Sequence, residues 1–217
     1  MLTVAYRRRA VIVSVMIRPL LALLVTLTPL PAFAQQPATA PTPVRVTITT
    51  ADGPIVAELD AVRAPISTAN FLRYVDARRF DGITFFRSMK LPWNAGIIQA
   101  GQHDAKKVYP PIAHEPTSKS GLSHVEGVLS MARREPGTAQ GDRSITIGDM
   151  TGLDAKPDGP GDDVGYAVFG RIVEGMDVVR RIWSAPTDPN AGDGAMKGQM
   201  LKPPVRILTI RRVAPAG

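Results

Sequence analysis

The sequence predicts a mainly β protein, in which a closed antiparallel β-barrel is capped by two α-helices. Short segments that alternate in polarity or are rich in β-branched residues recur along the chain, and loops containing glycine and proline separate them. Two further segments have apolar residues at helical spacing. With 217 residues, 44% of them hydrophobic, the chain can bury one good core, so we expect one folded domain.

The first elements follow one another closely. Residues 44–50 alternate in polarity, and Asp52-Gly53 turns the chain into a second strand at 55–59. A helix is predicted to begin at Pro65, with Ser67 or Thr68 capping its first turn. Its expected buried face consists of Ile66, Phe71, Leu72 and Val75.

The middle of the chain is predicted to hold short strands within long loops. A strand is expected at 83–87, whereas residues 88–122 contain repeated proline and glycine and are expected to be mostly loop. Another loop, rich in Gly, Pro and Asp, is expected at 149–163. The remaining strands of this part are predicted at 97–99, 127–132 and 145–147.

The segment 165–182 has the clearest pattern, which is typical of a strand, a turn and a helix. Residues 166–169 are expected to form the strand, and Gly170 and Gly175 to bracket the turn. In the helix that follows, Asp177 lies in the first turn and arginines lie in the last, as the helix dipole favours. A loop at 185–204 and a terminal strand at 205–213 complete the prediction.

Charge and cysteine content narrow the classes of function. The net charge is +7, but four arginines lie in the first 34 residues, which contain no acid. The rest of the chain has 22 basic and 19 acidic residues, which are scattered, so we expect no nucleic-acid groove. The absence of cysteine rules out disulfides and a lipoprotein attachment site.

The N-terminus has the pattern of a secretory signal peptide over residues 1–34. Basic residues precede a short apolar core, and Ala32-Phe33-Ala34 offers a cleavage site, with Met16 as a possible true start. The alternative is an uncleaved anchor over residues 10–30. Residues 35–43, QQPATAPTP, are expected to be a linker before the domain at 44–213. We expect a periplasmic monomer without stable membrane insertion after cleavage.

Four segments, in this order, resemble the cyclophilin-type peptidyl-prolyl cis-trans isomerases. They are Phe85-Phe86-Arg87, Gln99-Ala100-Gly101, GVLSMA at 127–132, and 165–182. The resemblance covers nearly all of 44–213, and it implies an eight-stranded barrel with two helices. It also implies isomerisation of X–Pro bonds without a cofactor or metal, and proline-containing peptides and unfolded exported proteins as partners.

The resemblance assigns site residues. Arg87 matches the arginine directed at the proline nitrogen and carbonyl, and Gln99 matches the glutamine that orients the peptide and the arginine. Isomerisation needs neither a nucleophile nor a metal, because the barrier of roughly 18–20 kcal/mol arises from amide resonance. The substrate pocket is expected at Ile97, Ala132, Arg133, Asp142, Ser144, Leu153 and Tyr166.

Several positions depart from the family pattern. Asp142 stands where glutamine is usual, Ser144 replaces a pocket phenylalanine, and Gly96 lies where an aromatic residue is expected. The segment between Arg87 and Gln99 is longer than usual and contains Trp93, which we hypothesise folds over the groove as a replacement wall. The alternative is that Trp93 anchors its loop against the barrel. These departures leave open a second function, a peptide- or partner-binding module with weak or no isomerase activity.

Other polar residues suggest no further chemistry. The acidic residues of 149–163 do not match the spacing of a calcium loop. Ser123 and Ser130 belong to no recognisable nucleophile motif, so hydrolysis has no support. Three histidines are too irregularly spaced for a zinc site and are expected to be solvated loop residues: His103, His114 and His124.

Overall fold

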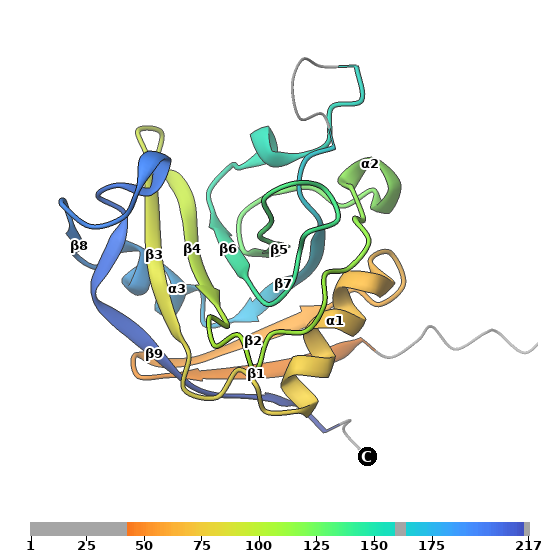
Figure 1. The fold of residues 1–217 in the computed structure, drawn as a ribbon, viewed down its shortest axis with the longest axis horizontal. Helices are drawn as coiled ribbons and strands as arrows, with labels where there is room; N and C mark the ends of the chain where they lie inside the picture. The colour runs from red at the N-terminus through yellow and green to blue at the C-terminus, as the bar shows by residue number, and fades with distance from the viewer. Residues whose placement is uncertain (1–42, 159–163, 215–217) are drawn as a thin grey trace, which may run out of the picture. The chain divides into compact units, whose positions relative to one another are not determined.

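The computed structural model describes residues 43–158 and 164–214 (Figure 1). The predicted signal peptide and all but the last residue of the predicted linker lie outside these ranges. The strands are β1 (Val44–Thr50), β2 (Gly53–Leu59), β3 (Thr84–Leu91), β4 (Ala95–Gly101), β5 (Val128–Met131), β6 (Arg143–Ile147), β7 (Val168–Glu174), β8 (Thr187–Asp188) and β9 (Met200–Arg212). The helices are α1 (Pro65–Asp76), α2 (Thr117–Ser120) and α3 (Met176–Ser184), with 3₁₀ turns at Thr151–Leu153 and Gly194–Met196.

Eight strands form a closed antiparallel barrel, which confirms the predicted fold class. The order around the barrel is β1-β2-β7-β5-β6-β4-β3-β9, and β9 pairs with β1 to close it. The short strand β8 pairs with β9 and lies outside this ring. Closure leaves no exposed edge among the eight strands.

The two longer helices pack against different strands of the barrel. Helix α1 contacts β7 and β9, whereas α3 contacts β2, β3 and β4. No side chain of α1 caps its first turn; instead Glu115 accepts hydrogen bonds from the backbone N–H groups of Ile66 (2.9 Å) and Ser67 (2.6 Å). A carboxylate at a helix N-terminus also complements the helix dipole. Within the described ranges, no helix has the length and apolar character to cross a bilayer.

The predicted buried face of α1 needs one correction. Ile66 is 42% exposed, whereas Phe71, Leu72 and Val75 are buried as expected. In the first turn, Ser67 and Thr68 are buried in place of Ile66. The core between α1 and the strands is aromatic: the Phe71 ring lies 5.4 Å from that of Phe80 and 5.5 Å from that of Phe169.

The segment predicted as loop after residue 87 is instead a β-hairpin. Strands β3 and β4 pair from Thr84–Gly101 to Leu91–Ala95, and the hairpin projects beyond the neighbouring strands in Figure 1. A three-residue turn, 92–94, joins them, and Asn94 has a φ of 59°, a conformation that asparagine tolerates. Proline at the turn and glycine in β4 concealed the strand pattern.

The turn predicted at 170–175 is also shorter than expected. Strand β7 continues through Gly170 to Glu174, because Gly170 pairs with Leu59 of β2 and Leu129 of β5. A Cβ at Gly170 would lie 2.7 Å from the carbonyl oxygen of Glu58, so this glycine permits close strand approach. Only Gly175, with a φ of 85°, makes the turn into α3.

Gly96 in β4 is a position where the packing excludes any side chain. A methyl group there would lie 2.0 Å from the carbonyl oxygen of Met89 and 2.7 Å from Nε1 of Trp183. We expect Gly96→Ala to lower the free energy of unfolding by about 1–3 kcal/mol or more, because the nearer obstacle is backbone. Gly152→Ala is the control, since a methyl group at Gly152 meets nothing within 4 Å. Denaturant titration measures both, and equal stability of the two variants would contradict the prediction.

Candidate active site

A bulge in β3 brings two neighbouring side chains to one cavity. Phe85 pairs with Ala100 and Arg87 pairs with Gln99, so Phe86 is an extra residue in β3. In a regular strand, neighbouring side chains face opposite sides of the sheet, but a bulge re-aims them. Phe86 and Arg87 therefore both line the same groove.

The guanidinium of Arg87 is held from two sides. Its Nη1 donates to Oε1 of Gln99 at 2.9 Å, and its Nε donates to Oε1 of Gln199 at 2.8 Å. The Gln199 amide nitrogen in turn donates to the carbonyl oxygen of Ala195 at 2.8 Å. Burial lowers the pKa of Arg87, but a guanidinium remains charged at neutral pH. The remaining nitrogen, Nη2, makes only a weak contact with Sδ of Met89 at 3.8 Å.

The groove beside Arg87 has a volume of about 960 Å³. Apolar side chains, among them Phe86, Met89 and Met131, alternate with polar groups along its walls. Such a combination is typical of sites that bind a small apolar group in a defined orientation. The lining includes every predicted site residue except Trp93: Arg87, Ile97, Gln99, Ala132, Arg133, Asp142, Ser144, Leu153 and Tyr166.

Comparison with known proteins accounts for this combination of barrel and groove. Residues 45–212 match the family described as "Cyclophilin type peptidyl-prolyl cis-trans isomerase/CLD". The chain belongs to this cyclophilin-type isomerase family. The family predicted from the sequence is thereby confirmed.

Curated relatives and solved structures agree with the assignment. Peptidyl-prolyl cis-trans isomerase A of Dickeya dadantii is 34% identical over 80% of this chain and 88% of its own. A peptidyl-prolyl cis-trans isomerase of Acinetobacter baylyi is 34% identical over 73% and 80%. Two crystal structures of a Cryptosporidium parvum cyclophilin share the fold at 21% identity, covering 80% and 78% of this chain and 99% of theirs. Their TM-scores are 0.64 and, in the presence of the dipeptide Ala-Pro, 0.62.

Asp142 replaces the usual cyclophilin glutamine and contacts the neighbouring polar groups. Its Oδ2 lies 3.5 Å from Nε2 of Gln99, which donates to it, and 3.5 Å from Nε2 of His103. The carboxylate occupies the space above Gly101, where a Cβ would lie 1.7 Å from Oδ1. Gln99 thus lies between a carboxylate and the Arg87 guanidinium, which fixes which way its amide points.

Aliphatic and thioether side chains form the part of the groove near Gly96 and Ser144. Ser144 is buried in β6 opposite Gln99 and supplies no ring, and Gly96 has no room for one. Beside them, a small apolar cluster has a buried centre to which partly buried side chains are added. It comprises Ala95, Ile97 and Met150 with Met89, Leu91 and Leu153. This cluster provides apolar surface on the side where the family has aromatic residues.

The structure does not bring Trp93 to the groove. Trp93 lies in the three-residue turn of the β3–β4 hairpin and is 64% exposed. Because Leu91 already pairs with Ala95, the hairpin carries this indole beyond the sheet. At this exposure the side chain is not packed against the barrel either, so neither alternative considered from the sequence describes its position.

Tyr166 and Arg133 form the far rim of the groove. The Arg133 guanidinium lies 4.7 Å from the centroid of the Tyr166 ring, within the range of a cation–π contact. Its Nε donates to the carbonyl oxygen of Gly165 at 3.1 Å. The backbone N–H of Tyr166 donates to the carbonyl oxygen of Leu153 at 3.0 Å, so these two predicted pocket residues are joined directly.

The expectation that all three histidines are solvated is wrong for His124. The His103 side chain is 63% exposed, and a ring nitrogen of His114 lies 2.9 Å from the carbonyl oxygen of Val164. His124 is completely buried and makes hydrogen bonds through both ring nitrogens. Its partners are Ser130, six residues away, and Asp154, thirty residues away, and no motif in the sequence links the three. Among the described residues, no three acidic or histidine side chains are grouped as a metal site.

Sequence reasoning also missed Gln199 and Phe86. Gln199 precedes β9, and only the pairing of Met200 with Arg87 brings it to the guanidinium. Phe86 lies in the quoted motif, but its direction depends on the bulge; its ring contacts that of His103, with centroids 4.9 Å apart. The direction of neither side chain can be read from the linear sequence.

Gln199 offers a test of how far Arg87 depends on its second anchor. We expect Gln199→Leu to lower kcat/KM for an X–Pro peptide roughly tenfold, because it removes one hydrogen bond to a charged group. Gln199→Glu keeps an oxygen acceptor for Nε and should retain most of the rate. An isomerase assay on both variants measures this. A Leu variant as active as the parent would mean that Gln99 alone orients the guanidinium.

Proposed function

We propose that this protein isomerises X–Pro bonds in exported proteins within the periplasm, with Arg87 stabilising the twisted bond. The observation that supports this most directly is the two-sided anchoring of Arg87 by Gln99 and Gln199 at the wall of a partly apolar groove. A relative of this fold was solved in the presence of Ala-Pro, which supports proline-containing peptides as ligands.

The proposed mechanism needs only hydrogen bonding and packing. As the X–Pro bond twists, conjugation is lost and the proline nitrogen regains a lone pair. Nη2 of Arg87 is the nitrogen with no strong partner among the described residues, and it is the donor that we assign to the proline nitrogen or carbonyl. Because Gln99 and Gln199 hold the cation in advance, little reorganisation is needed as the bond twists.

The proline ring is assigned to the apolar part of the groove. Ile97, Met131 and Leu153 supply aliphatic and thioether surface there, and unbranched methionine adapts to irregular shapes. A thousandfold acceleration requires about 4 kcal/mol of transition-state stabilisation. One hydrogen bond to a charged group supplies about 1.5–3 kcal/mol. The groove must therefore contribute the remainder by holding the ring while the bond rotates.

Replacing Arg87 tests the mechanism. We expect Arg87→Ala to lower kcat/KM by about 10- to 150-fold, the equivalent of that one hydrogen bond, with little change in Tm because the side chain borders an open groove. Arg87→Lys keeps the charge but cannot reach both glutamines, so it should recover only part of the rate. Exposed Arg180→Ala is the control for removing a surface charge.

A coupled isomerase assay with several X–Pro peptides, together with thermal unfolding, measures these effects. Lost activity accompanied by a large fall in Tm would assign Arg87 a structural role instead. A parent protein without a rate above background for any X residue would favour the peptide-binding module.

The periplasmic location has a separate test. The small-x-small sequence Ala32-Phe33-Ala34 after a short apolar segment predicts cleavage before Gln35. We expect the protein purified from a periplasmic extract to have the mass of a chain that begins at or near Gln35. Ala34→Arg is expected to block this processing, because it removes a small residue from the cleavage site. An intact N-terminus recovered in the membrane fraction would support the uncleaved anchor.

A further inference from the structure

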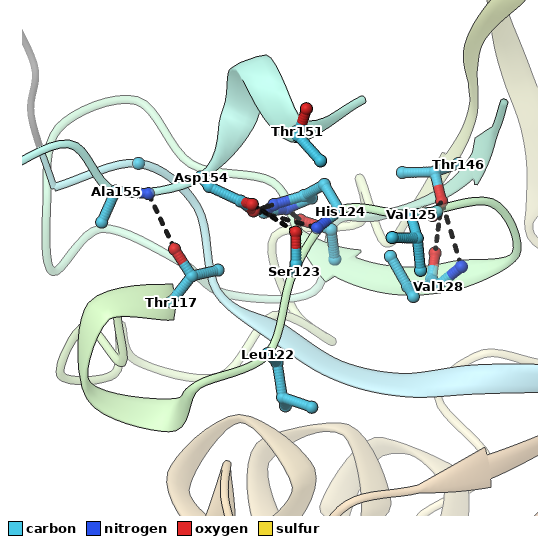
Figure 2. Close-up of polar contacts among 12 residues, drawn as sticks. Thr117, Leu122, Ser123, His124, Val125, Val128, Thr146, Thr151, Asp154 and Ala155 are labelled. Atoms are coloured by element: carbon cyan, nitrogen blue, oxygen red, sulfur yellow. Dashed lines mark hydrogen bonds and ion pairs between the residues drawn. The ribbon is translucent and has the colours of Figure 1, made fainter. Parts of the chain in front are cut away.

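At one wall of the groove, Asp154, His124 and Ser130 form a continuous hydrogen-bonded chain through a buried imidazole. Figure 2 shows the contacts of Asp154 with His124 and Ser123. Nδ1 of His124 lies 2.6 Å from Oδ1 of Asp154, and Nε2 lies 2.8 Å from Oγ of Ser130. Asp154 also accepts the backbone N–H of His124 at 2.9 Å and the hydroxyl of Ser123. His124 is fully buried, and every hydrogen-bonding position of its ring is occupied.

The order Asp154–His124–Ser130 resembles the connectivity of a hydrolytic triad, but the burial argues for another role. His124 is 0% exposed and Ser130 is 1% exposed. A nucleophile must reach the carbonyl that it attacks, and a general base must exchange its proton. Neither step is available to side chains enclosed in this way, so the chain is suited to holding parts of the structure together.

His124 joins two parts of the groove lining that are not otherwise neighbours in the sequence. Ser130 belongs to β5 and directly precedes Met131 and Ala132, which line the groove. Asp154 directly follows Leu153, which also lines the groove. The imidazole therefore bridges the strand and the loop that carry these lining residues.

The imidazole bridge is one of several ties that hold the loop carrying Leu153. This loop is a single 3₁₀ turn, Thr151–Leu153, without a ladder of strand hydrogen bonds. Its ties to the segment around His124 are the two Asp154 contacts with that residue, the bond from the Ser123 hydroxyl to Asp154, and a hydrogen bond from the Met150 N–H to the His124 carbonyl at 3.0 Å. The Leu153 carbonyl also accepts the N–H of Tyr166 at 3.0 Å. A further bond joins the Ala155 N–H to Oγ1 of Thr117 at 2.7 Å.

The protonation state of His124 follows from these contacts. Burial lowers the pKa of His124 by more than the neighbouring Asp154 carboxylate raises it, so the ring is neutral at pH 7. Nδ1 then carries the proton that Asp154 accepts, and Nε2 accepts the Ser130 hydroxyl. Asp154 is the one titratable side chain in contact with this ring among the described residues. On protonation, Ser130 would have to reverse its hydroxyl, which has no other partner in the described part of the chain.

We infer that His124 is a positioning residue of the isomerase site, which holds Leu153 against the Ser130–Ala132 edge of the groove. This inference rests on the proposed role of the groove in binding proline. Only the neutral imidazole donates to Asp154 and accepts the Ser130 hydroxyl at the same time. The bridge therefore holds Leu153 in place only when the ring is uncharged.

Two substitutions break the bridge at different points. His124→Asn keeps a donor for Asp154 but cannot reach Ser130 and does not titrate, and Ser130→Ala removes one hydroxyl alone. We expect each to raise KM for an Ala-Pro peptide, with kcat changed less, so that kcat/KM falls about five- to tenfold at pH 7.5. Ser130→Ala serves if the Asn variant does not fold.

The pH profile separates positioning from general destabilisation. Exchange spectroscopy by NMR follows the cis and trans peptide from pH 5 to 8 without a coupled protease. The parent should lose kcat/KM towards the acidic end of this range, because burial lowers the pKa of His124 and protonation of the ring disrupts the bridge. The Asn variant should show a smaller loss over that range than the parent. Val179→Ala, in the buried face of α3, is the control for lost stability without a change at the groove.

The pH dependence of the free energy of unfolding provides a second measurement, and its direction follows from the pKa shift of His124. Because the folded pKa is lower than the unfolded one, the unfolded chain binds more protons just below pH 6.5, and stability falls as the pH is lowered. His124→Asn should lack this part of the pH dependence.

If both variants match the parent in KM and pH profile while Arg87→Ala is impaired, the positioning role is overturned and the proposed function stands. An Arg87→Ala variant with the parent's rate would overturn the proposed function and, with it, this inference.

Discussion

Closure of the sheet between β1 and β9 is the interaction on which the remaining structure depends. The first and last strands pair from Val46–Arg212 to Thr50–Ile207, so strands from the two ends of the domain complete the ring. The same closure holds β9 beside β3, where Met200 pairs with Arg87 and the preceding Gln199 reaches the guanidinium. The orientation of the central cation is thus a consequence of barrel closure.

The groove lies on the barrel of the family, but several of its lining residues differ from the family pattern. The expected aromatic residues at Gly96 and Ser144 are absent, and at Gly96 the backbone of Met89 and the indole of Trp183 leave no space for one. Aliphatic and thioether side chains around Ile97 and Met150 provide the apolar surface there. Asp142 stands where the family glutamine is usual. Its carboxylate contacts Gln99 and occupies the space above Gly101.

Buried polar side chains determine the geometry at one wall of this site. Ser130, His124 and Asp154 satisfy one another, and a fully satisfied buried network favours a single arrangement. Glu115 acts similarly at the start of α1, where it accepts two backbone N–H groups from a segment far away in sequence. In both cases a side chain in a loop fixes a regular element that it does not belong to.

The sequence by itself determined the family, the eight barrel strands, both main helices and nine of the residues that line the groove. Polarity period and turn residues are local properties, and the motifs around Arg87, Gln99 and residues 127–132 are short. Tertiary structure decided the rest: the hairpin that carries Trp93 away from the groove, the bulge that turns Phe86 towards it, and the burial of His124. These features depend on strand register and on contacts between segments far apart in the chain, such as the contact between His124 and Asp154. No local pattern encodes which distant side chain will satisfy a buried polar group, because that choice is made only when the barrel closes.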